Sequence, residues 1–505
     1  MKKKLYEKLS VVLAVVLVCS MMIVSFAACG NTPGESGEST ENAETSGSTP
    51  TATGKFRVGY ARVNITPEGD GYPLAGYGRT DKRLSNGFLD YIYATCVAFE
   101  DEVGTRMLYL ASDLISVKNY RDTMRERLTK ALNIPVDNLV LTGSHTHSMV
   151  DSGQAAAFNN VKLYMEKVYD AVVQAATEAF ADLTESKMYW NTVDLKGYNF
   201  VRHYLGDTGM AIGDNHNSSD FWGAGTIVSH ASEANNIMYM VRFEREGAKD
   251  VLLTNWRAHP TITGGSAKTT ISSDYVGAIR SAIEKSEDCL FVYFQGEAGN
   301  MNPRTRLGTN VEYNPPTDVK QYGKEIAEKI SAVYKSDTWE EIPTGKIHTI
   351  HDDYMVDTNH SMDGYVTIAR QLYSVYSEYG WTDDLSVMLK ENGLYSPYQC
   401  GAIQTNSTRA LKESLSLHGT AIGDLLISNE ESEMFDTNGT FVRDNSPSKF
   451  TLIMSYSDGS GYIPSQQAYD YGCYEADTAR FAPGSGEVCA SRLLEMLNET
   501  WKMEH

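Results

Sequence analysis

Short apolar runs alternate with longer amphipathic segments through most of the chain. The apolar runs predict strands, and they occur at Thr105–Ser112, Asn138–Thr142, Met238–Phe243, Val251–Trp256, Cys289–Phe294, Asp424–Ser428 and Phe450–Ser455. Amphipathic periodicity predicts helices at Asn119–Asn133, Lys162–Ala181, Tyr275–Lys285, Val319–Tyr334 and Glu487–Met503. A strand, a helix and a second strand in succession indicate a parallel pair. The pattern therefore predicts an α/β fold, with a large mixed, mostly parallel sheet and helices on both faces.

Histidines follow two of these predicted strands. His145 and His147 stand two residues apart in GSHTHS, just after Asn138–Thr142. Residues two apart in extended backbone point to the same face, so the two imidazoles can converge. His259, in AHPT, follows Val251–Trp256. Three histidines at strand ends fit a catalytic zinc, which takes about three protein ligands and keeps one position open. The alternative is a group of strand-end histidines that only form hydrogen bonds.

Further polar residues follow predicted strands, at the sheet edge where α/β proteins bind ligands. Asp113 either caps a turn or accepts a hydrogen bond from a metal-binding histidine. Asp274 is either the N-terminal cap of a helix or a site residue. Three residues of a Gly-rich turn are expected to hold the backbone around the site: Glu297, Asn300 and Asn302.

The N-terminus has the pattern of an export signal. Lysines precede a long apolar run, Leu9–Ala28, which ends in small residues before Cys29. Residues 1–28 therefore resemble a bacterial lipoprotein signal peptide that leaves Cys29 lipidated, with a plain membrane anchor as the alternative. Residues 29–54 are rich in Gly, Ser, Thr and Glu and predict a disordered linker. We expect residues 55–505 to form one α/β domain, anchored at the bacterial cell surface outside the cytoplasmic membrane.

The formal net charge of −21 limits the partners of this domain. Such an acidic protein repels phosphate groups, which argues against nucleic acid and against electrostatic docking on anionic lipid. Five of the seven cysteines lie beyond the N-terminal region and show no paired spacing, so no disulfide framework is predicted. The sequence also lacks the GxSxG motif of serine hydrolases.

A series of motifs runs through most of the segment from Phe56 to Pro483. In order they are VGYARVNITP, LAGYG, LYLASDL, LTGSHTHS, NWRAHPT, ISSDYVG, FQGEAGNMNP and GYIPSQQAYDYGCYE. This series resembles the neutral/alkaline ceramidases, a family of zinc amidases that cleave the N-acyl bond of ceramide. The segments GSHTHS and AHPT are the most specific parts of the resemblance.

The resemblance implies a set of site residues and one Zn²⁺ per chain. The zinc ligands of the family fall on His145, His259, Glu433 and Tyr462. His147 falls on the proton-transfer histidine, and Tyr474 falls on a hydroxyl that steadies the reacting carbonyl. Arg202 falls near an arginine at the mouth of the family's site.

The chain departs from the family pattern in three places. Around Glu433 it reads NEESEMF, where the family has Pro-Gly before its glutamate, so Glu430 and Glu431 are alternative ligands. The segment around Arg202 lacks the Ser-Pro and Asn-Pro residues of the family. One predicted helix follows the last motif, so we expect the family's C-terminal β-sandwich domain to be absent.

These implications lead to a functional hypothesis with two alternatives. The resemblance implies a zinc-dependent amidohydrolase that cleaves an N-acyl amide, with ceramide, split into sphingoid base and fatty acid, as the leading substrate. The expected partners are this lipid and, through the lipid anchor, the membrane. One alternative is a zinc hydrolase of a non-sphingolipid amide or ester. The other is a lipid-anchored protein that binds a solute or lipid without catalysis.

Overall fold

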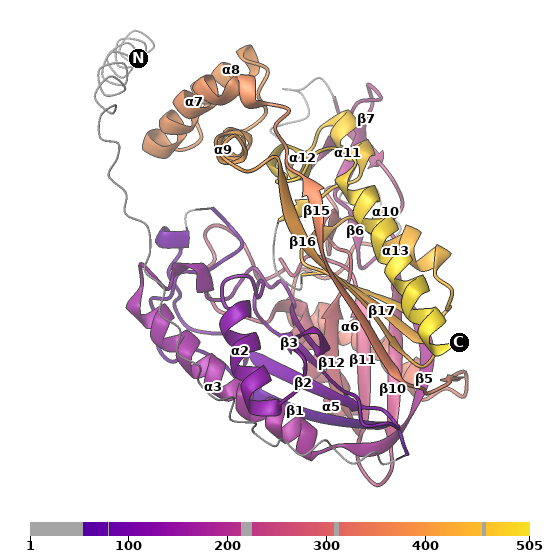
Figure 1. The fold of residues 1–505 in the computed structure, drawn as a ribbon. Helices are drawn as coiled ribbons and strands as arrows, with labels where there is room; N and C mark the ends of the chain where they lie inside the picture. Colours follow the sequence, from indigo (N-terminus) through magenta and orange to yellow (C-terminus); the bar gives the residue numbers. More distant parts are fainter. Residues whose placement is uncertain (1–53, 79, 214–224, 308–312, 457–460) are drawn as a thin grey trace, which may run out of the picture. The chain divides into compact units, whose positions relative to one another are not determined.

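The structure is a computed structural model that describes residues 54–78, 80–213, 225–307, 313–456 and 461–505 (Figure 1). The chain divides into two units, Met1–Ser48 and Thr49–His505, and all described residues belong to the second. The predicted signal peptide, Cys29 and the linker up to residue 53 lie outside the described residues. The predicted domain boundaries therefore stay predictions. Among the described helices, none combines the length and apolar character needed to cross a membrane.

The largest element is a sheet of nine described strands. Its path runs through β12 (Cys289–Gln295), β11 (Asp250–Trp256), β10 (Ile237–Arg245), β5 (Thr184–Asp194), β1 (Arg57–Asn64), β2 (Tyr93–Glu100), β3 (Arg106–Ser112) and β4 (Leu139–Gly143), with β14 (Glu340–Ile342) paired to β5. Only β3 with β4 and β11 with β12 are parallel among these pairs. The prediction of a mostly parallel sheet is therefore wrong. The predicted strands did not include β1 and β5, and tight connections such as 101–105 between β2 and β3 allow antiparallel pairing.

Helices cover one face of this sheet. They are α2 (Arg121–Leu132), α3 (Asn159–Ala181), α5 (Asp274–Ser286) and α6 (Val319–Tyr334). The opposite face packs on a second sheet, whose strand order is β15 (Ile347–Asp357), β16 (Lys412–Ile422), β17 (Leu425–Glu430) and β19 (Thr451–Met454). Two helices, α10 (Asp436–Asn445) and α13 (Ser485–Glu504), cover the outer face of that second sheet (Figure 1). The prediction of helices on both faces of the large sheet is therefore wrong, because a sheet covers one of them.

The apolar runs of the large sheet reflect burial on both faces. In β2, Ala94 and Cys96 face α3, whereas Val97 and Phe99 face the second sheet. The small side chains of β2 therefore pack against the helix, and its large side chains pack against the second sheet. All five described cysteines are buried and free.

The outer strands of the large sheet, β4 and β12, approach each other. A right-handed twist of roughly 20–25° per strand, accumulated across the sheet, turns its outer strands by roughly half a turn. Their carboxyl ends meet beyond β19: Gly143 N donates to the carbonyl of Tyr456 at 3.2 Å, and Ser455 N donates to that of Gln295 at 3.0 Å. This convergence brings loops from distant parts of the sequence to one place.

Between β15 and β16 the chain forms a helical insert of α7 (Val366–Tyr379), α8 (Asp383–Glu391) and α9 (Pro397–Asn406), which has its own apolar core. Short elements complete the described chain: β6 (Phe200–Val201) pairs with β13 (Met301–Asn302), β7 (His203–Gly206) pairs with β8 (Ala211–Gly213) and β9 (Ile227–His230), and β18 (Glu433–Met434) pairs with β20 (Tyr462–Ile463). The helices α11 (Gln466–Tyr471) and α12 (Tyr474–Thr478) follow β20.

Candidate metal centre

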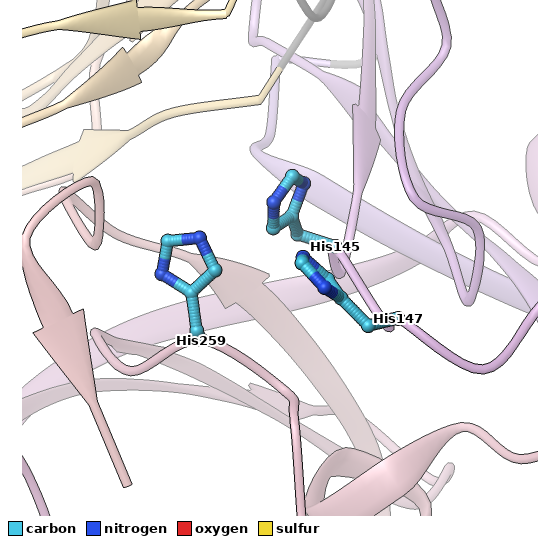
Figure 2. Close-up of side chains that lie close together, drawn as sticks. All are labelled: His145, His147 and His259. Atoms are coloured by element: carbon cyan, nitrogen blue, oxygen red, sulfur yellow. The ribbon is translucent and has the colours of Figure 1, made fainter. Parts of the chain in front are cut away.

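The three histidines predicted from the sequence lie together at the converging strand ends (Figure 2). His145 and His147 follow β4, and His259 follows β11. Their ring centroids are 4.9 to 5.5 Å apart. One ring nitrogen from each lies within 4.8 Å of the others. His145 has a left-handed backbone with φ of 68°, a conformation that non-glycine residues adopt at a cost and that is common at functional sites.

The hydrogen bonds of His145 and His259 fix the direction of their free nitrogens. Nδ1 of His145 lies 2.8 Å from the carbonyl oxygen of Ile115, and Nδ1 of His259 lies 3.1 Å from that of Met301. A carbonyl only accepts, so each Nδ1 carries the proton and each Nε2 presents a lone pair. Both lone pairs face Oε2 of Glu433, at 3.4 Å and 3.2 Å. Two imidazole nitrogens and a carboxylate oxygen that face one another could hold a metal ion, and this donor set suits Zn²⁺.

The charge states of these side chains agree with a metal site. Burial lowers the pKa of His259 to about 4, and the Arg202 charge adds to this effect, so the imidazole is neutral. Burial alone would raise the pKa of Glu433, but His145 and His259 hold it well below its usual range. A carboxylate at Glu433 and a neutral imidazole at His259 are the protonation states in which these two groups bind a metal.

His147 differs from the other two histidines because neither ring nitrogen has a partner among the described residues, although the side chain is buried. Burial lowers its pKa well below the usual value, and His145 and His259 lower it further. Its ring packs against Gly76, where a Cβ would lie 2.5 Å from Cγ of His147. Gly76 has φ of 96°, so both its backbone and its lack of a side chain are required here. An imidazole with two free nitrogens beside the metal ligands is suited to move a proton.

The remaining predicted residues come from β18, β20 and α12. The short parallel pair of β18 and β20 sets Glu433 opposite Tyr462. The ring of Tyr462 lies 6.3 Å from that of His259 and 5.8 Å from that of Tyr474. Burial raises the pKa of Tyr462 well above its usual range, an effect that the Arg202 guanidinium opposes. Burial also raises the pKa of Tyr474, to about 12, so its hydroxyl is a hydrogen-bond donor.

The neighbouring glutamates face other partners. Glu430 accepts hydrogen bonds from the backbone N and the hydroxyl of Ser432, both at 2.6 Å. Glu431 lies 3.5 Å from Arg121 of α2. Of the three carboxylates left open by the sequence, Glu433 is therefore the one that meets the histidines.

Arg202 is buried, whereas the resemblance implied a position at the mouth of the site. Its Nε lies 2.5 Å from Glu475, its Nη2 donates to the carbonyl of Gly299 at 2.7 Å, and its guanidinium stacks over the ring of Tyr462. These contacts place its charge next to the phenol that the resemblance assigns to the metal.

Asp113 and Asp274 hold the framework of the site. Asp113 accepts from Nη2 of Arg280 at 2.6 Å and from the backbone N of Tyr93 at 2.9 Å. Its alternative role, as the acceptor of a histidine, is wrong because backbone carbonyls fill that role. Asp274 is the first residue of α5 and accepts from the backbone N of Thr263 at 2.7 Å, which fixes the loop after His259.

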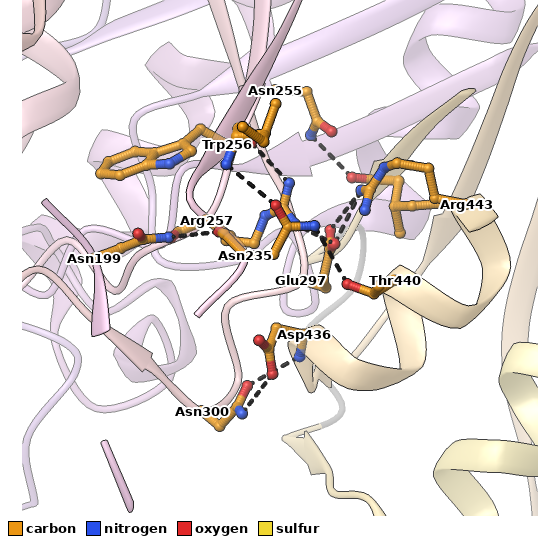
Figure 3. A network of polar contacts seen from close by, with 12 residues as sticks. Asn199, Asn235, Asn255, Trp256, Arg257, Glu297, Asn300, Asp436, Thr440 and Arg443 are labelled. Carbon is orange, nitrogen blue, oxygen red and sulfur yellow. Dashed lines mark hydrogen bonds and ion pairs between the residues drawn. The ribbon is translucent and has the colours of Figure 1, made fainter. Parts of the chain in front are cut away.

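A buried polar network joins the segments that carry His259 and Glu433 (Figure 3). The carboxylate of Glu297 lies 2.9 Å from Arg257, two residues before His259, and 2.9 Å from Arg443 of α10. Asn300 and Asp436, at the start of α10, exchange two hydrogen bonds. Asn300 holds backbone as predicted, because its Oδ1 accepts from the backbone N of Asp436, whereas Glu297 pairs with two arginine side chains. These contacts tie the loop after β12 to the segment that carries Glu433. Asn302 lies in β13, where it pairs with Phe200.

A second buried group of metal-ligating residue types lies nearby: His203, Cys473 and Glu475. Here both ring nitrogens of His203 are engaged, Nδ1 with the hydroxyl of Tyr471 at 2.5 Å and Nε2 with Glu475 at 3.0 Å. The carboxylate of Glu475 is also paired with Arg202. A cation is already supplied by the arginine, so this group does not need a metal.

Tyr456 is a residue of the site that the sequence reasoning missed. Its ring centroid lies 4.2 Å from that of His145, and its backbone is left-handed with φ of 65°. Nothing in its sequence context distinguishes it from the other tyrosines of the chain. Glu475 and Arg257 were also missed, although each stands inside a quoted motif.

The fold is similar to solved ceramidase structures. The neutral ceramidase from Pseudomonas aeruginosa matches with a TM-score of 0.64 and 15% sequence identity, over 89% of this chain and 75% of that one. The structure of a ceramidase complexed with C2 matches with the same TM-score and identity, over 89% of this chain and 76% of that one. At this identity the similarity concerns the fold. No curated protein matches the sequence.

A family model adds a match in sequence. Residues 56–290 match the model described as neutral/alkaline non-lysosomal ceramidase, N-terminal. The matched segment includes His145, His147, His259 and Arg202, whereas Glu433, Tyr462 and Tyr474 lie beyond it. The resemblance inferred from the sequence motifs is thereby confirmed: residues 56–290 match the N-terminal part of the neutral/alkaline non-lysosomal ceramidases, and the fold is similar to that of solved ceramidases.

Proposed function

We propose that this protein is a zinc-dependent amidase that hydrolyses an N-acyl amide, with ceramide as its leading substrate. The observation that carries the proposal is the orientation of His145 and His259, whose lone pairs point with the carboxylate of Glu433 at one position. This arrangement supports one metal ion per chain, bound by these three residues and Tyr462. The family match and the ceramidases among the similar structures support ceramide as the substrate.

The chemistry that zinc supplies when bound is a lowered pKa of water, toward about 7, and polarisation of a carbonyl. His147 accepts a proton from the attacking water at one of its two free ring nitrogens while the water oxygen adds to the amide carbon. The same nitrogen then returns the proton to the leaving amine as the C–N bond breaks. The Tyr474 hydroxyl donates a hydrogen bond to the oxyanion formed from the carbonyl oxygen.

Arg202 has a supporting part in this mechanism. Its guanidinium lies over the ring of Tyr462, where a fixed positive charge favours an anionic phenol oxygen over a neutral one. Glu475 pairs with Arg202, so the arginine charge is buried as part of an ion pair.

The N-terminal sequence supports a location for the reaction. We infer that the domain is exported and anchored outside the cytoplasmic membrane through lipidated Cys29, with residues 29–54 as the linker. A lipid-anchored hydrolase would meet lipid substrates in or near a membrane. Labelling of the cells with radioactive palmitate, with Cys29→Ala as the control, tests this anchor.

The substrate is tested with a panel of ceramides, N-acyl amino acids and short N-acyl amines, assayed with and without a chelator. Ceramide cleavage that a chelator stops and zinc restores is the expected result. Chelator-sensitive cleavage of only the other amides would keep the chemistry and remove ceramide as the substrate. No cleavage of any member by zinc-loaded protein would contradict the proposal.

A further inference from the structure

The helical insert carries a row of aromatic rings. Tyr373 and Tyr376 are three residues apart in α7 and so share a face, with ring centroids 5.9 Å apart. The ring of Tyr376 lies 5.8 Å from that of Tyr398 in α9. The ring centroid of Trp381, which lies between α7 and α8, is 6.1 Å from that of Tyr398. The row therefore ends on Tyr398.

Tyr398 contacts Tyr474, which links the row of rings to the candidate metal centre. The two rings meet edge to face, with centroids 5.9 Å apart and an interplanar angle of 90°. Tyr474 in turn packs against Tyr462 at 5.8 Å. Both tyrosines of the site are only partly buried.

A second contact brings Tyr398 to the segment LAGYG. A Cβ on Gly78 would lie 3.7 Å from Cε1 of Tyr398, which is van der Waals contact. Gly76 of the same segment packs on His147. Tyr398 is thus flanked by the segment beside the proton-transfer histidine and by the tyrosine expected to bind the substrate carbonyl oxygen.

The core of the insert does not explain these rings. That core consists of Ala369, Leu372, Leu385, Leu389, Leu394, Cys400 and Ile403. Tyr376 packs against it in part, but Tyr373, Trp381 and Tyr398 do not belong to it. Tyr373 is 38% exposed. Partly exposed aromatic rings that pack on one another offer apolar surface to a ligand.

We propose that Tyr398, with Tyr376 and Trp381, receives an apolar chain of the substrate, which makes Tyr398 a specificity-determining residue. This rests on the proposed amidase function, because the site of hydrolysis fixes where the chain begins. A substrate whose carbonyl oxygen meets Tyr474 has one chain on each side of the amide, and the next surface beyond Tyr474 is Tyr398. Apolar burial scales with area, so a longer chain on that side binds more strongly.

The test uses two series of amides, one that lengthens the acyl chain from acetyl to palmitoyl and one that lengthens the amine chain. The chain that meets Tyr398 belongs to one of these two series. In that series, Tyr398→Ala should lower kcat/KM for the longest members by about tenfold or more and change kcat/KM for the shortest by about twofold or less. Tyr398→Phe, which keeps the ring, should resemble the wild type. Tyr379→Ala is the matched control, because Tyr379 is an exposed tyrosine of the same helix. Zinc content should be equal in all variants.

An equal loss on short and long substrates, or an equal loss in Tyr379→Ala, would overturn this inference. Calorimetric binding of N-lauroylglycine and N-acetylglycine to the zinc-loaded protein separates it from the proposed function. Preferential binding of the lauroyl compound that Tyr398→Ala weakens about tenfold, with no hydrolysis of any amide, would refute the function and support the aromatic path. Hydrolysis that does not depend on chain length in either series would support the proposed function and refute the aromatic path.

Discussion

The protein contains two neighbouring buried clusters that combine histidine with glutamate. In the metal centre, the Nδ1 atoms of His145 and His259 are bound to backbone carbonyls, and their Nε2 atoms converge on Glu433. In the second cluster, both nitrogens of His203 have partners and Glu475 is paired with Arg202. Residue type alone would make both clusters metal sites. The difference lies in whether an arginine already neutralises the carboxylate.

The largest expected effect is loss of the metal. His145→Ala and His259→Ala each remove a ligand and should abolish zinc binding and hydrolysis. His147→Ala should keep most of the zinc and lower kcat by on the order of 10²–10⁴, the range for loss of a general acid–base. Metal analysis of the three variants, together with their turnover, measures this. Equal metal loss in all three would mean that His147 is a ligand.

A smaller effect is expected from substitution of the carboxylate in the same cluster. Glu433→Gln should weaken zinc binding by about 10–100-fold or more, because a neutral amide replaces the anion that faces two imidazoles. Glu430→Gln and Glu431→Gln are matched controls from the same segment and should bind zinc like the wild type. Competition with a zinc-sensitive dye gives the affinities. A loss confined to either control would move the ligand within NEESEMF.

The second cluster should respond differently from the first. Cys473→Ser should leave zinc content unchanged, since that cluster is expected to hold no metal. Glu475→Gln should also keep about one zinc per chain but lower kcat by roughly tenfold, because Arg202 loses the anion that fixes it beside Tyr462. A second zinc in the wild type, lost in Cys473→Ser, would show that both clusters bind metal and would break the comparison.

The smallest effect concerns stability near the metal centre. Burial raises the pKa of Glu430 from 4.5 to about 7. The folded state therefore binds this proton more tightly than the unfolded state, and the contribution to stability is complete below about pH 4.5 and lost as pH rises through about 7. Glu430→Gln should remove this loss and raise the unfolding free energy at pH 8 by roughly 1–3 kcal/mol relative to the wild type. Urea titrations at about pH 5 and about pH 8 compare the two; an equal pH dependence would refute the assignment.

The sequence predicted the histidines well because their signal is local. A His-x-His after an apolar run, followed by a second run that ends at His259, needs only the strand period and the turn position. The helices α3, α5, α6 and α13 were predictable for the same reason, since amphipathic periodicity is a local property.

The rest of the fold and site depends on distant contacts. Strands β15 and β16 alternate polar and apolar residues weakly, so the second sheet, and with it the covered face of the large sheet, was not evident from the pattern. Three acidic residues in NEESEMF offered equivalent ligands until the pairing of β18 with β20 set Glu433 opposite Tyr462. The partner of Arg202 is Glu475, far along the chain, and no spacing in the sequence relates the two.

The central claim is that the converging lone pairs of His145, His259 and Glu433 hold one catalytic zinc. The most direct measurement is metal analysis of the purified protein, combined with amide hydrolysis before chelation, after chelation and after return of zinc. The account predicts about one zinc per chain, loss of hydrolysis on chelation and recovery on addition of zinc. Hydrolysis that persists in metal-free protein, or a protein that binds no zinc, would contradict it.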